Sequence, residues 1–517
     1  MRRFILLATL VLPCCRAAGH GATVLYASGA DLQSVDPLFT RHPLALQVQR
    51  YVLLTTLVRY DSALRLQPYL ARHWTWSPDG RRLTLRLFPG LRWHDGVLTT
   101  ARDVAWTLER ARDLATGYPR YHDLAPLAAV TSVDDTTLVL QFRDPPGAIP
   151  DVLAELAILP RHLLDTVPLA RLRQAGWHEH PVGNGPFRFV AHEAHRRWVF
   201  ERNPDFPAEL GGPPRLERFI VAVVAEPMTK LAALTAGEID FAGIQPAHAS
   251  FVARDSDLVV REYPVLFPTG IVFNARRPPF DRLEARQAVD RAVDRRQLVD
   301  GFAWGFATPA EGPVPPELSS ALTVMRGAWY VVRGACCVPC VEHCGQGTEF
   351  RDLSSEFRVP TAGQNTQHAS LSTHHASRTT HHPEVALHFE LLTVGSGEAA
   401  LEQMVQAQLS RTGIRVTIRQ LELSAFLARV YGPTHDFDAA LLGTPGDLGL
   451  GYLGPLAALS GLEPPSGRAA LLRFYRDQLP VSVLYHPHGV QGANRRVRGV
   501  VLSLAGELES VTRWETR

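Results

Sequence analysis

The segment from Tyr60 to Arg110 constrains the fold of this 517-residue chain more than any other segment does. Residues 77–80 read SPDG, which is a turn signature because proline presets φ, aspartate bonds back to the backbone and glycine accepts a positive φ. Leu83, Leu85 and Leu87 then alternate with polar residues, a pattern that predicts a strand with one buried face. We therefore expect a tight turn that leads directly into a half-buried strand.

A predicted helix completes this segment. Asp95 and Gly96 form a second turn signature, and Thr100 follows as a helix N-cap. Asp103 lies three residues later, in the first turn of the helix, where a carboxylate is favourable. The apolar spacing continues through Leu108, which predicts an amphipathic helix. An ordinary β-β-α unit is one interpretation of this order of elements.

The same order of elements is also typical of a protein family. The proline-anchored segment, tryptophan, DG turn, strand, HDG turn and capped helix resemble the solute-binding proteins of peptide ABC transporters. These are the oligopeptide- and dipeptide-binding proteins, extracellular solute-binding protein family 5. Further stretches carry the resemblance: SVDP at 34–37, VGNGPF at 182–187, LAALTAGEIDF at 231–241 and IVFNARRPPFD at 271–281. In all, the resemblance covers roughly residues 23–322 and 387–490.

The bulk composition excludes several classes of protein. With 46% apolar and 20% charged residues, the chain is typical of soluble globular proteins, and its length predicts two or three lobes. A net charge of +2 without a basic block gives no support for a nucleic-acid partner. Lys230 is the only lysine, so a Walker A loop is excluded. No nucleophile elbow or HExxH motif is present, and we expect no enzyme activity.

The N-terminal residues 1–19 are predicted to be a signal peptide. The apolar run Phe4–Leu12 is too short to span a bilayer, and Ala17, Ala18 and Gly19 offer small residues for cleavage. Cys14 introduces a lipid-anchor alternative, although the preceding proline makes a poor lipobox. We therefore expect an exported, periplasmic protein, either free or anchored at Cys14.

Residues 323–382 depart from the rest of the chain. They contain four cysteines, two histidine pairs and many Ser/Thr residues, and apolar periodicity is lost. Three interpretations stay open: out-of-frame or inserted sequence, a low-complexity insertion, and a metal site at Cys337 and Cys340 with His343 and Cys344. The single CxxC is weak evidence, so we predict no metal ligands and no cofactor, and we assign no function to this segment.

The resemblance implies an α/β fold, the bilobal periplasmic-binding-protein-like fold of class II type, with an extra subdomain on the first lobe. We assign residues 21–52, 181–263 and 486–517 to lobe I, and residues 53–180 to the extra subdomain. Lobe II, which closes on the ligand, comprises residues 264–485, interrupted by 323–382. Tyr263 and Pro264 lie where the chain would cross between lobes, so they are hinge candidates.

The candidate ligand-binding residues follow from the chemistry of a peptide and from the resemblance. A peptide's α-ammonium needs a carboxylate partner. The family supplies an aspartate four residues after the glycine that ends a central strand, which is Asp447 here. The family's usual tryptophan after that glycine is replaced by Thr444. Asn274 is a cleft candidate or a structural turn residue, and Trp304 lines the pocket or belongs to the core.

The function implied by the resemblance is the capture of a peptide or similar solute and its delivery to an inner-membrane ABC permease. Ligand would bridge both lobes of a monomer and stabilise a closed state by hinge motion. Two alternatives remain open at this point. The same fold also serves binders of nickel, haem or oligosaccharides. A closure-defective product is the other alternative, because the 323–382 segment and a shortened stretch after Leu450 both fall in lobe II.

Overall fold

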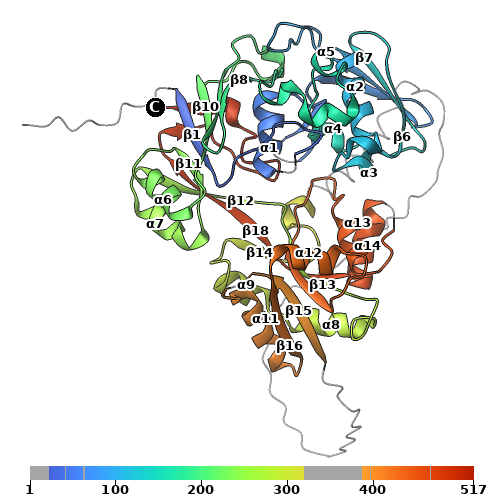
Figure 1. Ribbon diagram of the computed structural model, residues 1–517, viewed down its shortest axis with the longest axis vertical. Helices are drawn as coiled ribbons and strands as arrows, with labels where there is room; N and C mark the ends of the chain where they lie inside the picture. The colour runs from blue at the N-terminus through green and yellow to red at the C-terminus, as the bar shows by residue number, and fades with distance from the viewer. Residues whose placement is uncertain (1–21, 41, 62–63, 320–386, 396, 466) are drawn as a thin grey trace, which may run out of the picture.

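The computed structural model describes residues 22–319 and 387–517, apart from 41, 62, 63, 396 and 466 (Figure 1). The predicted signal peptide, Cys14 and the segment 323–382 lie outside the described residues. Within the described part, no helix is long and apolar enough to cross a membrane.

Lobe I is built on a mixed sheet around β1 (Thr23–Ser28). This strand pairs in parallel with β10 (Arg218–Val223) on one side and β11 (Phe241–Gly243) on the other. Beyond β10 the sheet continues antiparallel through β9 (Arg197–Arg202) and β8 (Phe187–Glu193). Helices α6 (Pro227–Thr235) and α7 (Ala249–Arg254) cover one face through a small apolar cluster that includes Leu231, Leu234 and Val252.

The extra subdomain contains the segment that the sequence made most predictable. Its sheet has the order β4 (Ala71–Trp76), β5 (Arg82–Leu87), β7 (Thr137–Phe142) and β6 (Leu127–Ser132), with antiparallel neighbours throughout. Leu83 and Leu85 are fully buried, as the alternation predicted. Helix α2 (Ala101–Ala111) begins with a capping box, in which Asp103 Oδ2 accepts from the Thr100 amide at 2.7 Å. Turn, strand and capped helix are therefore all confirmed.

Lobe II has a second sheet with helices on both sides. Its strand order is β16 (Arg415–Leu421), β15 (His388–Val394), β17 (Ala439–Gly443), β13 (Thr269–Phe273) and β18 (Val481–Asn494). The core between the sheet and its helices includes the packed rings of Phe273, Phe280 and Phe389. The helices are α8 (Leu283–Ala292), α9 (Arg295–Gly301), α11 (Ala400–Arg411) and α12 (Leu423–Tyr431).

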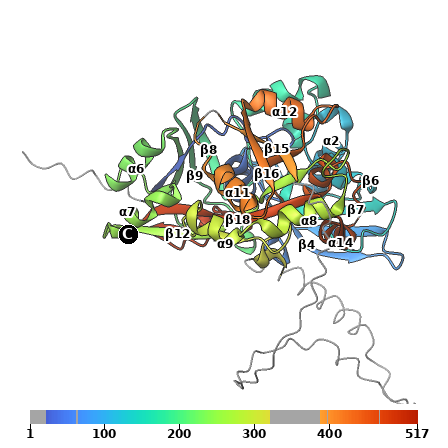
Figure 2. The same ribbon diagram turned by 90° about the horizontal axis from the view of Figure 1, so that it is seen from below.

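Strand β18 belongs to both sheets and therefore joins the lobes. Its first residues pair with β13 in lobe II, whereas residues from His488 onward pair with β12 (Leu258–Pro264) in lobe I. The chain crosses between lobes a second time at residues 265–268, between β12 and β13. Figure 2, seen from below, shows β18 with α8 and α9 of lobe II beside it. Tyr263 and Pro264 end β12 at this crossing, and their hinge role stays a prediction.

The remaining elements complete the two lobes. Helices α13 (Leu453–Leu459) and α14 (Arg468–Gln478) lie below the extra subdomain (Figure 1). The last strands, β19 (Val497–Arg498) and β20 (Glu515–Thr516), return to lobe I, where Trp514 stacks on Phe241 at 5.2 Å. The shorter elements are α1 (Pro43–Val48), β2 (Val58–Tyr60), β3 (Leu66–Pro68), α3 (Tyr121–Leu124), α4 (Val152–Glu155), α5 (Arg161–Leu164) and β14 (Ala307–Pro309).

Candidate functional site

The loop that follows β17 lies against the crossing between the lobes. The Thr444 amide donates to the Pro268 carbonyl at 3.1 Å, and the Gly446 amide donates to the Leu266 carbonyl at 2.7 Å. Gly443, the last residue of β17, has no room for a side chain, because a Cβ atom there would lie only 2.1 Å from the Phe267 ring. The sequence therefore fixes this loop on the inter-lobe connection by close backbone packing.

Asp447 stands in this loop and faces the extra subdomain. Its carboxylate accepts from the amides of Gly451 at 3.0 Å and Tyr452 at 3.1 Å, which orders the start of α13. Oδ1 also lies 3.6 Å from a guanidinium nitrogen of Arg120, which belongs to the extra subdomain. The side chain is 17% exposed. Asp447 thus contacts both lobe II and the extra subdomain. Its carboxylate oxygens can accept further hydrogen bonds, and charged side chains lie next to them.

Asp447 is part of a larger group of charges, the interlobe charge cluster, which consists of Arg50, Arg120, Asp123, Asp151, Glu155, Asp447 and Arg468. Arg120 pairs with Asp123 at 2.6 Å and also with Glu155. Arg468, in α14, crosses to Asp151, whose carboxylate also accepts from the Tyr60 hydroxyl at 2.6 Å. Four carboxylates therefore share three guanidinium groups where lobe II meets the subdomain.

Burial and charge shift the pKa values within this cluster in directions that follow from its geometry. Burial by itself would lower the pKa of Arg120, but Glu155, Asp447 and Asp123 outweigh it and raise the pKa above its ordinary value. Burial raises the pKa of Glu155, although Arg120 and Arg50 oppose it. Arg120 therefore stays charged, while Glu155 binds a proton more readily than an ordinary glutamate does.

The structure places the other predicted site residues in different surroundings. The Thr444 hydroxyl is buried and lacks a hydrogen-bond partner among the described residues. Asn274 Nδ2 donates to the carbonyls of His435 and Phe437, and its Oδ1 accepts from the Arg276 amide at 3.2 Å. The amide of Asn274 is thus occupied inside lobe II, which is the structural role that the sequence left open.

Trp304 lies in the turn after α9, on the lobe II side of the crossing. It adopts a left-handed φ of 55° and its side chain is 63% exposed, so it is not a core tryptophan. The same turn is tied to β18, because the His488 amide donates to the Phe306 carbonyl at 3.0 Å. Thr444 and Asp447 therefore share one loop, whereas Asn274 and Trp304 belong to two other parts of lobe II.

The sequence did not single out several residues that the structure brings to this boundary. Phe267 is 42% exposed and Phe302 is 40% exposed, both near the crossing. Arg120 and Arg468 supply the cations that face the aspartates. No local pattern marks the arginines, because Arg468 and Asp151 are 317 positions apart. Within residues 22–319 and 387–517, no group of three or more His, Cys, Asp or Glu residues is arranged to hold a metal ion.

Comparison with known proteins gives matches over different shares of the chain. A provisionally named ABC transporter peptide-binding protein of Brucella ovis is 32% identical over 256 residues, which is 49% of this chain and 48% of the relative. The glutathione-binding protein GsiB of Escherichia coli is 28% identical over 318 residues, 61% of this chain and 60% of the relative. The chain thus spans about half the length of the first of these relatives and three fifths of the second.

The fold and the family are shown over a larger part of the chain. The oligopeptide-binding protein AppA of Bacillus subtilis, solved with a nonapeptide, superposes with a TM-score of 0.67 at 19% identity, covering 96% of this chain and 99% of that one. This confirms the bilobal α/β fold expected from the resemblance. Residues 65–453 match the profile described as bacterial extracellular solute-binding proteins, family 5 Middle. The chain therefore belongs to the bacterial extracellular solute-binding proteins of family 5.

Proposed function

We propose that this chain captures a peptide or similar solute between its two lobes outside the inner membrane and delivers it to an ABC permease. The observation that carries this proposal is the position of Asp447, whose carboxylate lies at the inter-lobe boundary, 3.6 Å from Arg120. The two relatives described above, a peptide-binding protein and a glutathione-binding protein, point to the same ligand class. Capture and release require no covalent chemistry.

The charges at the boundary favour a ligand that carries an ammonium group. Four carboxylates share three guanidinium groups there, so an additional cation improves the charge balance. At 3.6 Å the Arg120–Asp447 pair is longer than an optimal charge-assisted hydrogen bond, which measures about 2.7–2.9 Å. An α-ammonium group can therefore approach Asp447 without displacing a tightly bonded partner.

Other side chains near the crossing are suited to the rest of a peptide. Thr444 contributes by holding the loop of Asp447 on the inter-lobe connection, through the bond from its amide to the Pro268 carbonyl. Trp304, Phe302 and Phe267 expose aromatic surface that can pack against ligand side chains. Asn274 contributes by shaping lobe II through its internal hydrogen bonds. Ligand held between these residues of lobe II and the subdomain would stabilise the closed arrangement.

Export and anchoring belong to this proposal as well. A leader at residues 1–19 would direct the chain out of the cytoplasm as a monomer, either free or lipid-anchored at Cys14. Mass spectrometry of the mature N-terminus distinguishes cleavage near Gly19 from a diacylglyceryl adduct on Cys14. A protein that keeps its full leader and stays in the cytoplasm would contradict the proposal.

The test is a titration of the purified mature protein with di- to hexapeptides and glutathione, followed by calorimetry and thermal melting. Nickel, haem and oligosaccharides are included as competing ligand classes. Each binding peptide is compared with its N-acetylated form, which lacks the ammonium charge. A ligand at a hundredfold excess over its Kd stabilises the native state by about 2.7 kcal/mol.

The matched variants are Asp447→Asn and Asp477→Asn. Asp477 is an exposed aspartate of α14 that pairs with its neighbour Arg476. We expect peptides to stabilise the wild type and Asp477→Asn equally, and both N-acetylation and Asp447→Asn to weaken binding about tenfold or more. Peptide binding that is unchanged by both would refute the ammonium role of Asp447. Binding of only nickel, haem or an oligosaccharide would refute the peptide function.

A further inference from the structure

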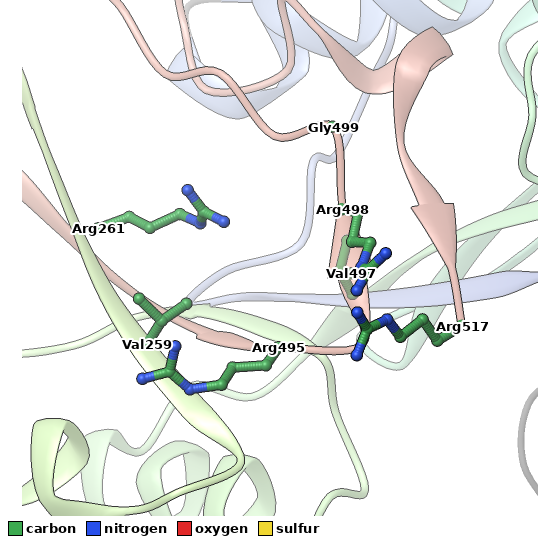
Figure 3. Close-up of a pocket in the computed structure, with 7 residues that line it drawn as sticks. All are labelled: Val259, Arg261, Arg495, Val497, Arg498, Gly499 and Arg517. Atoms are coloured by element: carbon green, nitrogen blue, oxygen red, sulfur yellow. The ribbon is translucent and has the colours of Figure 1, made fainter.

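A second candidate binding site lies in lobe I, away from the boundary between the lobes. A hollow of about 390 Å³ is lined by four arginines, Arg261, Arg495, Arg498 and Arg517, together with Val259, Val497 and Gly499 (Figure 3). This volume is within the range of roughly 300–1,000 Å³ that is typical of small-molecule sites. We call this hollow the arginine pocket.

The arginines reach the pocket from strands that the fold holds together. Arg261 is on β12, and β12 pairs with the end of β18, after which Arg495 follows. Arg498 is in β19, which pairs with β20 and so brings the next residue, Arg517, to the same place. The Arg517 amide also donates to the Arg496 carbonyl at 3.1 Å. Backbone pairing therefore fixes the positions of like charges that would otherwise separate.

The four guanidinium groups lack counter-ions in the part of the chain that the structure describes. None of them has a salt bridge or a side-chain hydrogen bond there, and the Nε atom of Arg261 is buried without a partner. Two neighbouring charged residues, by contrast, do form salt bridges. Arg496 pairs with Asp240 at 2.6 Å, and Glu515 pairs with Arg215 at 2.7 Å. Asp240 and Glu515 are therefore already engaged with other arginines.

An unneutralised group of like charges is unfavourable unless an anion joins it. Burial and the nearby Arg495 lower the pKa of Arg261, the direction expected of a cation among cations. A guanidinium group presents a planar fork of donors that matches the oxygens of phosphate. Arg261 is half-buried, and the other three arginines are exposed around it. The pocket therefore offers hydrogen-bond donors both at its base and at its opening.

We propose that the arginine pocket binds a phosphate group, carried either by a free small molecule or by the headgroup of an anionic phospholipid. This site is separate from the proposed peptide site. The first probe is pyrophosphate, titrated into the full-length mature protein by calorimetry at low and high salt. We expect binding at low salt that weakens as salt is added, because the contacts are partly exposed.

The variants Arg261→Gln and Arg498→Gln test the site directly, and Arg254→Gln is the matched control. Arg254 is an exposed arginine of α7 in the same lobe, outside the pocket. We expect each pocket variant to weaken pyrophosphate binding about tenfold, with no change in the control. Arg498 is exposed, so its variant tests the site even where Arg261→Gln lowers stability. Equal binding by all variants would overturn the proposal.

Vesicle co-sedimentation distinguishes the two sources of phosphate. The protein is mixed with phosphatidylcholine vesicles with and without phosphatidylglycerol. Sedimentation that requires phosphatidylglycerol and is lost in Arg498→Gln identifies a lipid headgroup. Pyrophosphate binding without sedimentation identifies a free phosphorylated molecule. Both results support the pocket, whereas binding of neither pyrophosphate nor phosphatidylglycerol vesicles overturns it.

Discussion

Replacing Arg120 by methionine tests the main energetic claim about the interlobe charge cluster. The change keeps an apolar stem of similar length but removes the cation that faces Glu155, Asp123 and Asp447. Glu155 then retains only the weaker contact with Arg50 at 3.8 Å. Both side chains of the Arg120–Glu155 pair are largely buried, at 20% and 14% exposure. The variant therefore leaves a largely buried carboxylate without its principal partner.

The magnitude follows from the cost of an unpaired buried charge. Removing one member of a buried ion pair costs about 3–5 kcal/mol, and residual exposure favours the lower end. We therefore expect a loss of about 3 kcal/mol in the free energy of unfolding, measured by urea denaturation at neutral pH. For a cooperative unit of 150–250 residues, this corresponds to a fall in Tm of roughly 6–12 °C. The control Arg102→Met breaks an exposed pair with Asp135, whose side chains are 59% and 61% exposed, and should cost under about 1 kcal/mol.

The pH dependence of Arg120→Met gives a second, independent check. In the folded wild type the pKa of Glu155 is above its ordinary value, and loss of Arg120 raises it further. A folded state with the higher pKa binds the proton more tightly, so lowering the pH stabilises it relative to the unfolded state. The deficit of Arg120→Met should therefore shrink as pH falls from neutral towards the range where glutamate titrates. A deficit below about 1 kcal/mol, or one that is independent of pH, would refute this reasoning.

Three further changes test other parts of the structure. Burial raises the pKa of Glu507, which accepts from the Tyr26 hydroxyl at 2.6 Å, so wild-type stability should fall as pH rises through that pKa. Glu507→Gln should remove this dependence, and parallel Tm–pH curves for the two proteins would contradict it. Gly443→Ala places a methyl group against Phe267 and should cost about 1–3 kcal/mol in urea unfolding, whereas an unchanged midpoint would mean that the ring moves freely. Trp304 is 63% exposed, so Trp304→Ala should alter Tm little but weaken peptide binding in calorimetry. A large drop in Tm would instead indicate a packing role.

The fold was predictable from the sequence where local chemistry determined it. In the extra subdomain, the turn at 77–80, the alternating leucines and the Thr100–Asp103 capping box each report on neighbours only a few residues away. The family resemblance then supplied the bilobal arrangement, which the structural match confirms. The lobe boundaries are still predictions, although the assigned change at residue 486 falls within β18, where its partner changes from β13 to β12.

The candidate site was less predictable because its contacts join distant parts of the chain. The sequence indicated Asp447 through its place after a strand-ending glycine, but gave no sign of Arg120 as its cross-boundary partner. Asn274 had two open interpretations, since one asparagine after a strand can face a cleft or hold a turn. The ligand roles of all these residues remain predictions for the binding experiments.

The shared strand β18 also has a consequence for the order in which the molecule can assemble. Residues 481–494 lie late in the sequence, yet β13 in lobe II and both β11 and β12 in lobe I need them as hydrogen-bonding partners. Neither sheet is complete until residues 481–494 have been synthesised and have paired with these strands. Contacts between residues that are far apart in the sequence form slowly. Both sheets can therefore be completed only after residues 481–494 have taken their place between them.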